Sequence, residues 1–352
     1  MLEKGTSNKS AQDIADTLDL YGASLEVSPG FDFVSVSLYA LKSKLADVFP
    51  LFLEILTDPV FPESEWILAK DIFLQNLKIS LEKTSYRAGN IFRGHLYGGA
   101  HPYGSTIGEQ AVNAIASSDF STFFRTHYKV HSIYWVGNLT DTECNMLAQG
   151  FSGLPGGTSF PVHPKDEQTG KIKEHIIKEG SLQSSIRIGC RTISKGHADY
   201  FDLLLFNHVL GGFFGSRLMK NIREEKGLTY GIYSSLNTFI NDAAWIIGAE
   251  VNQSNLQLAI DEIHVELNHL QNIPVSPEEL MLARNHFIGS LQTDMANLFS
   301  VIDKVRNIHI YQLPQSYYQD LIHRLDLVTP SDLIRIANTY LKESDVVEVS
   351  VG

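Results

Sequence analysis

Apolar residues along the first half of the chain recur at two spacings, one typical of helices and one typical of strands. Ser10 and Asp13 can form a capping box before an apolar-faced run, and Gly22 follows as a stop signal. The pattern predicts a helix, two alternating strands, two further helices, and then a last helix and strand. The expected ranges are Ser10–Tyr21, Ala23–Val27, Phe33–Ala40, Ser43–Leu56, Glu63–Glu82, Ser118–Tyr128 and Ser132–Val136.

The second half of the chain predicts the same order of elements. Its expected strands are Thr229–Asn237, Ala244–Val251 and Val346–Val351, with helices at Leu256–Leu270, from Pro277 onward and at Pro330–Tyr340. Matching residues lie at a nearly constant offset: 215 residues separate Pro62 from Pro277, 213 separate Asp119 from Asp332, and 215 separate Gly137 from Gly352. This ordered set favours an internal duplication over two unrelated α+β halves that share common capping chemistry. The predicted fold is therefore α+β, with two domains that each pack helices on one face of an antiparallel sheet.

The segment between the two halves has the composition of a linker. Helix breakers and polar residues dominate from Gly153 to Glu167, with little apolar periodicity. We expect a first domain at residues 1–154, a linker at 155–170 and a second domain at 171–352. The second domain begins with a predicted strand pair, Lys173–Lys178 and Ser184–Cys190, which has no counterpart in the first half. Either the halves differ there, or the chain lacks the beginning of its first domain.

Composition narrows the classes of partner. Of the 352 residues, 43% are hydrophobic and 19% are charged, which is typical of a soluble globular protein. The formal net charge of −12 disfavours nucleic acid or an anionic membrane as the main partner, because both attract basic surfaces. No apolar run reaches transmembrane length, so we expect a soluble protein of the cytoplasm or periplasm. Cys144 and Cys190 predict two unpaired thiols and no disulfide framework.

Four motifs carry a family resemblance. The most specific is GGFFGSRL at Gly211–Leu218 followed by IREEKGLTY at Ile222–Tyr230; the others are GTSNKSA at Gly5–Ala11, LYGASL at Leu20–Leu25 and HPYG at His101–Gly104. Together they resemble the pitrilysin/insulinase family of zinc peptidases, in its mitochondrial-processing-peptidase-like branch. The resemblance runs from Leu2 to Gly352 and implies the LuxS/processing-peptidase-like fold.

The resemblance also implies where a zinc site would lie. In active members, zinc is bound by His-x-x-Glu-His on a helix of the first domain and by a glutamate about 76 residues downstream. The motif would fall just before Met1, and the later family helix that carries two glutamates aligns with a helix holding Ala69 and Asn76. Alanine cannot bind a metal, and a neutral amide replaces a carboxylate poorly on zinc. The resemblance therefore implies a chain with no zinc or catalytic residues of its own and zinc in a partner subunit.

Other histidine pairs do not predict a metal site. His264 and His269 are five residues apart, about 140° around a helix, which favours a solvated helix face. His127 and His131 are four apart, but they straddle the predicted end of a helix and start of a strand, which favours a structural role. Neither His-x-x-Glu-His nor His-Glu-x-x-His occurs in the sequence.

Two residues of the second-domain signature are candidates for substrate binding. In the family, an arginine and a tyrosine of this signature hold the substrate at a zinc site, and the matching residues here are Arg223 and Tyr230. Arginine offers fixed donors to a peptide carbonyl, and a tyrosine hydroxyl can stabilise an oxyanion. The alternative is a surface ion pair between Arg223 and a neighbour such as Glu224 or Glu225.

The surroundings of this pair suggest two further features. The loop Gly211–Gly215 follows an apolar helix and lacks the lysine of a P-loop, so a flexible loop at the mouth of a chamber is favoured over a phosphate cradle. The apolar segments Ser184–Ile188 and Ala244–Val251 are expected to be edge strands that accept an extended peptide by strand addition.

Three functions remain open at this point. The first is a non-catalytic, substrate-binding subunit of a heterodimeric zinc endopeptidase, with a zinc-bearing sister chain as partner and a peptide as substrate. The second is a structural or peptide-binding member of the family with no peptidase role. The third is a zinc metallopeptidase whose metal motif lies upstream of Met1.

Overall fold

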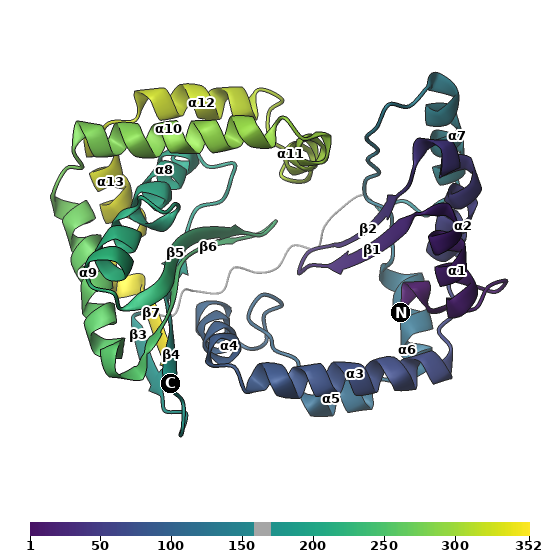
Figure 1. The fold of residues 1–352 in the computed structure, drawn as a ribbon, viewed down its shortest axis with the longest axis horizontal. Coiled ribbons are helices and arrows are strands. Elements are labelled where there is room, and N and C mark those ends of the chain that lie inside the picture. The colour runs from purple at the N-terminus through teal and green to yellow at the C-terminus, as the bar shows by residue number, and fades with distance from the viewer. Residues whose placement is uncertain (158–169) are drawn as a thin grey trace. The chain divides into compact units, whose positions relative to one another are not determined.

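A computed structural model describes residues 1–157 and 170–352 (Figure 1). These residues form two compact units, Met1–Ile79 with residues 107–157, and Ser80–Thr106 with residues 170–352. The segment Ser80–Thr106 thus belongs with the C-terminal part of the chain, which differs from the expected division after residue 154. Most of the expected linker at 155–170 lies outside the described residues.

The first unit contains a short antiparallel sheet and several helices. Helix α1 begins after Ser10, whose side chain accepts a hydrogen bond from the Asp13 N–H in the expected capping box, and ends at Gly22 in the left-handed conformation (φ 59°). The elements of this unit are η1 (Leu2–Lys4), α1 (Ala11–Tyr21), β1 (Ser24–Pro29), β2 (Val34–Tyr39), η2 (Lys42–Lys44), α2 (Leu45–Thr57), α3 (Glu63–Leu81), α5 (Glu109–Ala114), α6 (Ser117–His127) and α7 (Asp141–Phe151).

The core of the first unit lies between the β1–β2 sheet and helices α1 and α2. Alternation sends Val27 and Val36, which pair across the two strands, to the same face. There they pack against a buried cluster that includes Ile14 of α1 and Ile55 of α2. The burial of this face explains why the alternating pattern predicted both strands.

The expected strand Ser132–Val136 is not among the strands of residues 1–157 and 170–352. Its neighbour Val130 forms an isolated parallel bridge with Gly156. In the described residues of the first unit, the sheet consists of β1 and β2, which pair with each other.

The second unit is built on a five-stranded sheet of order β3-β7-β4-β6-β5. All neighbouring strands are antiparallel except β3 and β7, which are parallel. The elements of this unit are α4 (Thr84–Tyr97), β3 (Ile172–Ile176), β4 (Gln183–Arg191), α8 (Tyr200–Gly211), η3 (Met219–Glu225), β5 (Thr229–Thr238), β6 (Ala243–Asn252), η4 (Gln253–Asn255), α9 (Leu256–Asn272), α10 (Pro277–Asp294), α11 (Leu298–Ile310), α12 (Tyr317–Leu327), α13 (Pro330–Tyr340), η5 (Glu343–Asp345) and β7 (Val347–Val351).

Both faces of this sheet are covered. One face, which carries Ile188 and Trp245, packs against the large core formed with α8, α9, α10, α12 and α13. On the opposite face, Val347 and Val349 pack against Phe92 of α4. The α+β architecture matches the sequence prediction, and α4 adds a helix on the face that was expected to be free.

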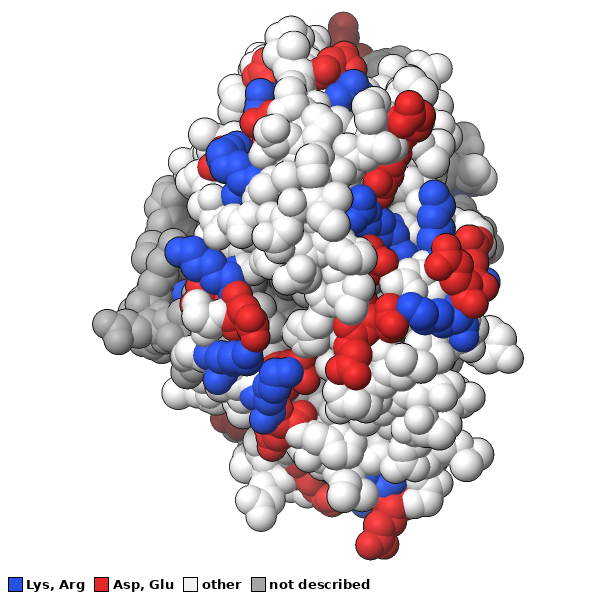
Figure 2. Space-filling view, turned by 90° about the vertical axis from the view of Figure 1, so that its left-hand side faces the viewer, with Lys and Arg blue, Asp and Glu red and all other residues white. Residues whose placement is uncertain are grey.

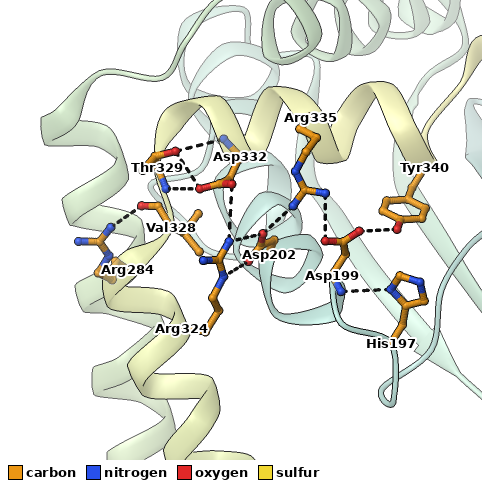
Figure 3. A network of polar contacts seen from close by, with 10 residues as sticks. All are labelled: His197, Asp199, Asp202, Arg284, Arg324, Val328, Thr329, Asp332, Arg335 and Tyr340. Atoms are coloured by element: carbon orange, nitrogen blue, oxygen red, sulfur yellow. Dashed lines mark hydrogen bonds and ion pairs between the residues drawn. The ribbon is translucent and has the colours of Figure 1, made fainter.

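An ion-pair network centred on the buried Asp202 joins three helices of the second unit (Figure 3). The Asp202 carboxylate on α8 accepts two hydrogen bonds of 2.7 Å from Arg324 on α12 and one of 3.0 Å from Arg335 on α13. Thr329 caps the first turn of α13 in a box with Asp332, which also lies 3.6 Å from Arg324. These contacts hold α12 and α13 against α8.

The distribution of surface charge and the apolarity of the helices can be compared with the composition. Figure 2 shows basic and acidic side chains interspersed over the face in view, with no extended area of one sign. Among the described residues, no helix has both the length and the apolarity needed to cross a membrane. Cys144 and Cys190 are both unpaired, as expected.

Candidate functional site

Arg223 lies on η3, a π-helical turn of the second unit. The Lys226 N–H donates to the Asn221 carbonyl at 3.1 Å, five residues back, and the Leu228 N–H donates to the Ile222 carbonyl at 2.9 Å. Ile222 is fully buried in the core, whereas Arg223, the next residue, is half-exposed. The wider turn therefore anchors its apolar residue and presents the arginine at the surface. Such turns are frequent at functional sites.

The guanidinium of Arg223 is stacked on an aromatic ring. Its central carbon lies 4.9 Å from the centre of the Phe214 ring, a cation–π distance. Nearby cations have carboxylate partners: Arg217 pairs with Glu279, and Lys226 pairs with Glu262. Across residues 1–157 and 170–352, no carboxylate forms an ion pair with Arg223. The alternative of a surface ion pair with a neighbouring glutamate is therefore not what this structure contains.

Tyr230 is presented by an irregularity in strand β5. The pairing of β5 with β6 shifts between Thr229 and Ile232, so Tyr230 sits in a bulge. The Thr229 hydroxyl stabilises the bulge, because it donates to the Glu250 carbonyl at 2.6 Å and accepts from the Gly231 N–H at 3.1 Å. The Tyr230 side chain is 92% exposed. A bulge commonly re-aims a side chain in this way.

The glycine-rich loop between α8 and η3 is closely packed. A Cβ on Gly211 would lie 2.6 Å from the Ser234 backbone nitrogen, and a Cβ on Gly212 would lie 2.7 Å from His208. Phe213 turns inward and stacks on His208, with 4.7 Å between ring centres, while Phe214 remains 57% exposed. The loop thus places one phenylalanine in the core and the next at the surface.

A histidine pair supports the inward side of this loop. His208 Nε2 on α8 lies 3.1 Å from His286 Nδ1 on α10. The Phe213 ring stacks on the His208 imidazole and lies tilted against that of His286. Burial, together with the neighbouring His286, lowers the pKa of His208 to about 4. A neutral His208 can share a hydrogen bond with His286, since one nitrogen donates and the other accepts.

The two segments expected to be edge strands are central. Ser184–Ile188 lies in β4, between β7 and β6, and Ala244–Val251 lies in β6, between β4 and β5. Their backbone groups are already paired on both sides, so a peptide cannot add to either. Their apolar pattern reflects burial on both faces and not an exposed edge.

The outer edge of β5 is partly covered by side chains. Asn207 Nδ2 donates to the Ser234 carbonyl at 3.1 Å, and the Tyr311 hydroxyl donates to the Thr238 carbonyl at 2.9 Å. These bonds occupy acceptors that would otherwise attract another strand. We therefore place no strand-addition site there.

Ala69 and Asn76 both lie on α3 in the first unit. Ala69 is half-buried and Asn76 is exposed, and seven residues are nearly two full turns, so they share one helix face. A methyl group and a neutral amide supply no carboxylate there, so this face does not fit a zinc site. In residues 1–157 and 170–352, no three His, Cys, Asp or Glu side chains converge in a metal-binding arrangement.

The other histidine pairs do not converge either. His264 on α9 lies 2.6 Å from Glu348 of β7, so it packs onto the sheet and is not on the solvated face that we expected. His269 lines a surface pocket with Arg217 and Asn221. At the end of α6, the His127 ring lies tilted against Phe123, with ring centres 4.7 Å apart.

The role of the HPYG motif was not evident from the sequence. Tyr103 is fully buried and stacks on Phe239 of the second unit at 4.2 Å, and its N–H donates to His101 Nδ1 at 3.1 Å. A Cβ on Gly104 would lie only 2.2 Å from the Gly98 carbonyl oxygen. The motif is a tight aromatic anchor for the segment that carries α4. Only the density of aromatic residues around it hinted at burial.

Comparison with known proteins agrees with this architecture. The family described as "Peptidase M16 inactive domain" matches residues 115–287. The "Uncharacterized zinc protease YmxG" of Bacillus subtilis is 22% identical over 309 residues, covering 86% of this chain and 75% of the relative. The "Non-peptidase homolog YmxG" of Helicobacter pylori is 21% identical, covering 98% and 81%.

A solved structure has the same fold. It is described as the peptidase M16 inactive domain from Pseudomonas fluorescens, and it superposes with a TM-score of 0.89 at 25% identity, covering all of this chain and 86% of its own. A protease structure from Helicobacter pylori superposes with a TM-score of 0.81 at 18% identity. These matches confirm the family resemblance of the sequence motifs: the chain is similar to M16 peptidases, the pitrilysin/insulinase family, in sequence and in fold.

Proposed function

We propose that this chain is a non-catalytic, substrate-binding subunit of a heterodimeric M16 zinc endopeptidase. The observation that carries the proposal is the presentation of Arg223 and Tyr230 at the surface of the second unit. The Arg223 guanidinium lies over the Phe214 ring, and no carboxylate of the described residues pairs with it. A bulge in β5 presents Tyr230 at the surface. Residues kept only for stability would more commonly be paired or packed.

The chemistry of the pair suits an extended peptide. Guanidinium N–H groups can donate to backbone carbonyls, and an exposed phenol can donate to a carbonyl oxygen or to an oxyanion that develops from it. Ala69 and Asn76 do not fit zinc, so we assign no hydrolytic step to this chain. In the proposed heterodimer, zinc and the general base belong to a sister subunit of the same family.

The proposal is tested by finding and reconstituting the sister subunit. Copurification should recover a family member with an intact His-x-x-Glu-His motif. In the reconstituted pair, Arg223→Ala and Tyr230→Phe should each lower peptide turnover by about tenfold or more, as expected for loss of one oriented donor. Size-exclusion chromatography should show unchanged assembly. Arg306→Ala, at an exposed arginine paired with Asp303, is the matched control and should leave turnover unchanged. Normal turnover in both site variants would refute the role.

A second candidate is a binding or structural member of the family with no peptidase role. It is favoured by the printed name of the Helicobacter pylori relative, a non-peptidase homolog. This candidate predicts that the double variant Arg223→Ala/Tyr230→Phe keeps its normal partners and their function. Loss of partner function in the double variant would count against it.

A third candidate is an active peptidase whose metal motif lies upstream of Met1, as the printed names of several relatives as zinc proteases suggest. Metal analysis of the protein as it is expressed from its complete gene decides this point. Stoichiometric zinc bound by that single chain would replace the two-subunit proposal.

A further inference from the structure

The contact between Arg223 and Phe214 joins two residues that are nine positions apart in sequence and belong to different motifs. Phe214 comes from the loop after α8, and Arg223 comes from η3. A guanidinium that lies over an aromatic ring is held by its face, and its N–H groups point outward from its edge in the plane of the group. This geometry restricts the arginine without using its donors.

The ring under Arg223 is itself held in place by close packing. A Cβ on Gly215 would lie 2.7 Å from the Phe213 ring, and Gly211 and Gly212 are similarly tight against Ser234 and His208. Phe213 lies within 4.7 Å of both His208 and His286, measured between ring centres. The loop is therefore closely packed on both sides of Phe214, which restricts the backbone position from which the exposed ring supports Arg223.

This support matters because an exposed arginine has many rotamers. Ordering such a side chain on binding costs free energy, and prior ordering removes part of that cost. The usual device for ordering an arginine is a carboxylate, but a carboxylate would also occupy its donors. An aromatic ring orders the guanidinium and leaves the donors available.

We propose that Phe214 is a positioning residue, which holds the Arg223 guanidinium by its face so that the edge can bind backbone carbonyls of an extended peptide. This inference rests on the proposed function, because it takes Arg223 as the peptide-binding group. Phe214 acts through Arg223 and makes no required contact of its own with the peptide.

The binding test uses the full chain and fluorescein-labelled oxidised insulin B chain as an extended peptide probe, measured by fluorescence anisotropy. Arg223→Ala should weaken binding about tenfold, as for loss of a charged donor. Phe214→Leu should weaken it about threefold, as for loss of an exposed cation–π contact, and Phe214→Tyr should restore it. Phe299→Leu, at an exposed phenylalanine of α11, is the matched control and should have no effect.

The double variant separates positioning from direct contact. If Phe214 acts only through Arg223, adding Phe214→Leu to Arg223→Ala should cause no further loss. A further threefold loss in the double variant overturns the positioning role, and so does unchanged binding in Phe214→Leu alone when Arg223→Ala has weakened it. Unchanged binding in Arg223→Ala instead overturns the proposed function.

A spectroscopic measurement decides the positioning role independently of any peptide. In protein with 15N-labelled arginine, the Arg223 Nε–H signal, identified by its loss in Arg223→Ala, should be shifted upfield by the ring current of Phe214. The shift should disappear in Phe214→Leu and persist in Phe214→Tyr. An Arg223 signal that is unchanged in Phe214→Leu overturns the inference, even where Arg223 proves to bind peptide.

Discussion

Asp202 illustrates how one side chain can hold several helices. This residue of α8 is 1% exposed, and its carboxylate pairs with Arg324 and Arg335, which come from α12 and α13 (Figure 3). A carboxylate this deep is tolerated only with such partners, because burying an unpaired charge is costly. The positions of these three residues in the sequence do not predict that they form a cluster.

Asp202→Ala is expected to destabilise the protein by about 2–4 kcal/mol, because it leaves two partly buried arginines without their shared partner. Urea unfolding followed by circular dichroism measures the change. Asp303→Ala removes an exposed carboxylate that pairs with Arg306, and as the control it should change stability by less than about 0.5 kcal/mol. Equal losses of stability in the two variants would show that the burial of Asp202 does not determine its contribution to stability.

His208 makes stability depend on pH. Its pKa is about 4 in the folded chain, against an ordinary value of 6.5, so between these pH values the unfolded chain binds more protons. The contribution is present above pH 6.5 and is lost as the pH falls toward 4, at about 1.4 kcal/mol per pH unit at most. His208→Gln should therefore reduce the loss of stability between pH 6.5 and pH 4, as measured by urea unfolding.

The control for this experiment is His323→Gln, because His323 is exposed on α12. It should keep the pH dependence of the native chain. If His208→Gln and His323→Gln give the same profile as the native chain, the titration of His208 does not govern acid stability.

At the scale of elements, close approaches between helix, strand and loop determine the site. Gly211 ends α8 where the helix meets β5, and the next residues form the loop that carries Phe214. The π-turn η3 and the bulge in β5 then present Arg223 and Tyr230. The sequence predicted the helix and the strand at these places, but not the two irregularities, because each depends on contacts with a neighbouring element.

Gly211→Ala is expected to destabilise the second unit by about 1–3 kcal/mol, because the added methyl would lie 2.6 Å from the backbone nitrogen of Ser234. Gly289→Ala is the matched control, since it lies inside α10 with open space around its Cβ position. That control should stabilise the protein by about 0.5–1 kcal/mol through helix propensity. Thermal unfolding of both variants measures the difference, and a neutral Gly211→Ala would disprove the tight approach.

At the scale of the whole molecule, the change in composition at 155–170 does not reveal every division of the chain, because Ser80–Thr106 also belongs to the second unit. Helix α4 comes from the first half of the sequence, yet its Phe92 packs on Val347 and Val349 in the last strand of the second unit. Such packing joins residues more than 250 positions apart. The linker-like composition at 155–170 therefore does not account for the whole division into compact units.

Phe92→Ala should destabilise the second unit, by about 3–5 kcal/mol for a large buried ring. Trp66, Trp135 and Trp245 are the three tryptophans, so Trp66→Phe/Trp135→Phe leaves Trp245, buried in the second unit, as the reporter. In that background Phe92→Ala should lower the urea midpoint of Trp245 fluorescence. Leu147→Ala, in the core of the first unit, should leave that midpoint unchanged. The reverse result would place α4 with the first unit.

Local signals in the sequence determined much of the fold. Capping residues such as Ser10 and Thr329, and periodic apolar positions, act within a few residues, so the helices and most strands could be placed from the sequence. Residue identity likewise showed that Ala69 and Asn76 lack the carboxylates of a zinc site. The internal duplication stays a prediction from the matching residue offsets, since the two sheets differ in their number of strands.

Only the tertiary structure decided which segments have partners. The apolar runs of β4 and β6 suggested edge strands, but both strands are central because other strands lie on both sides of each. The sequence also did not determine which residue contacts the Arg223 guanidinium. Glu224 and Glu225 are adjacent to it in sequence, but Phe214 is the residue that contacts it in the structure. Pairing and packing depend on residues far apart in the chain, and a local pattern contains no information on which of them meet.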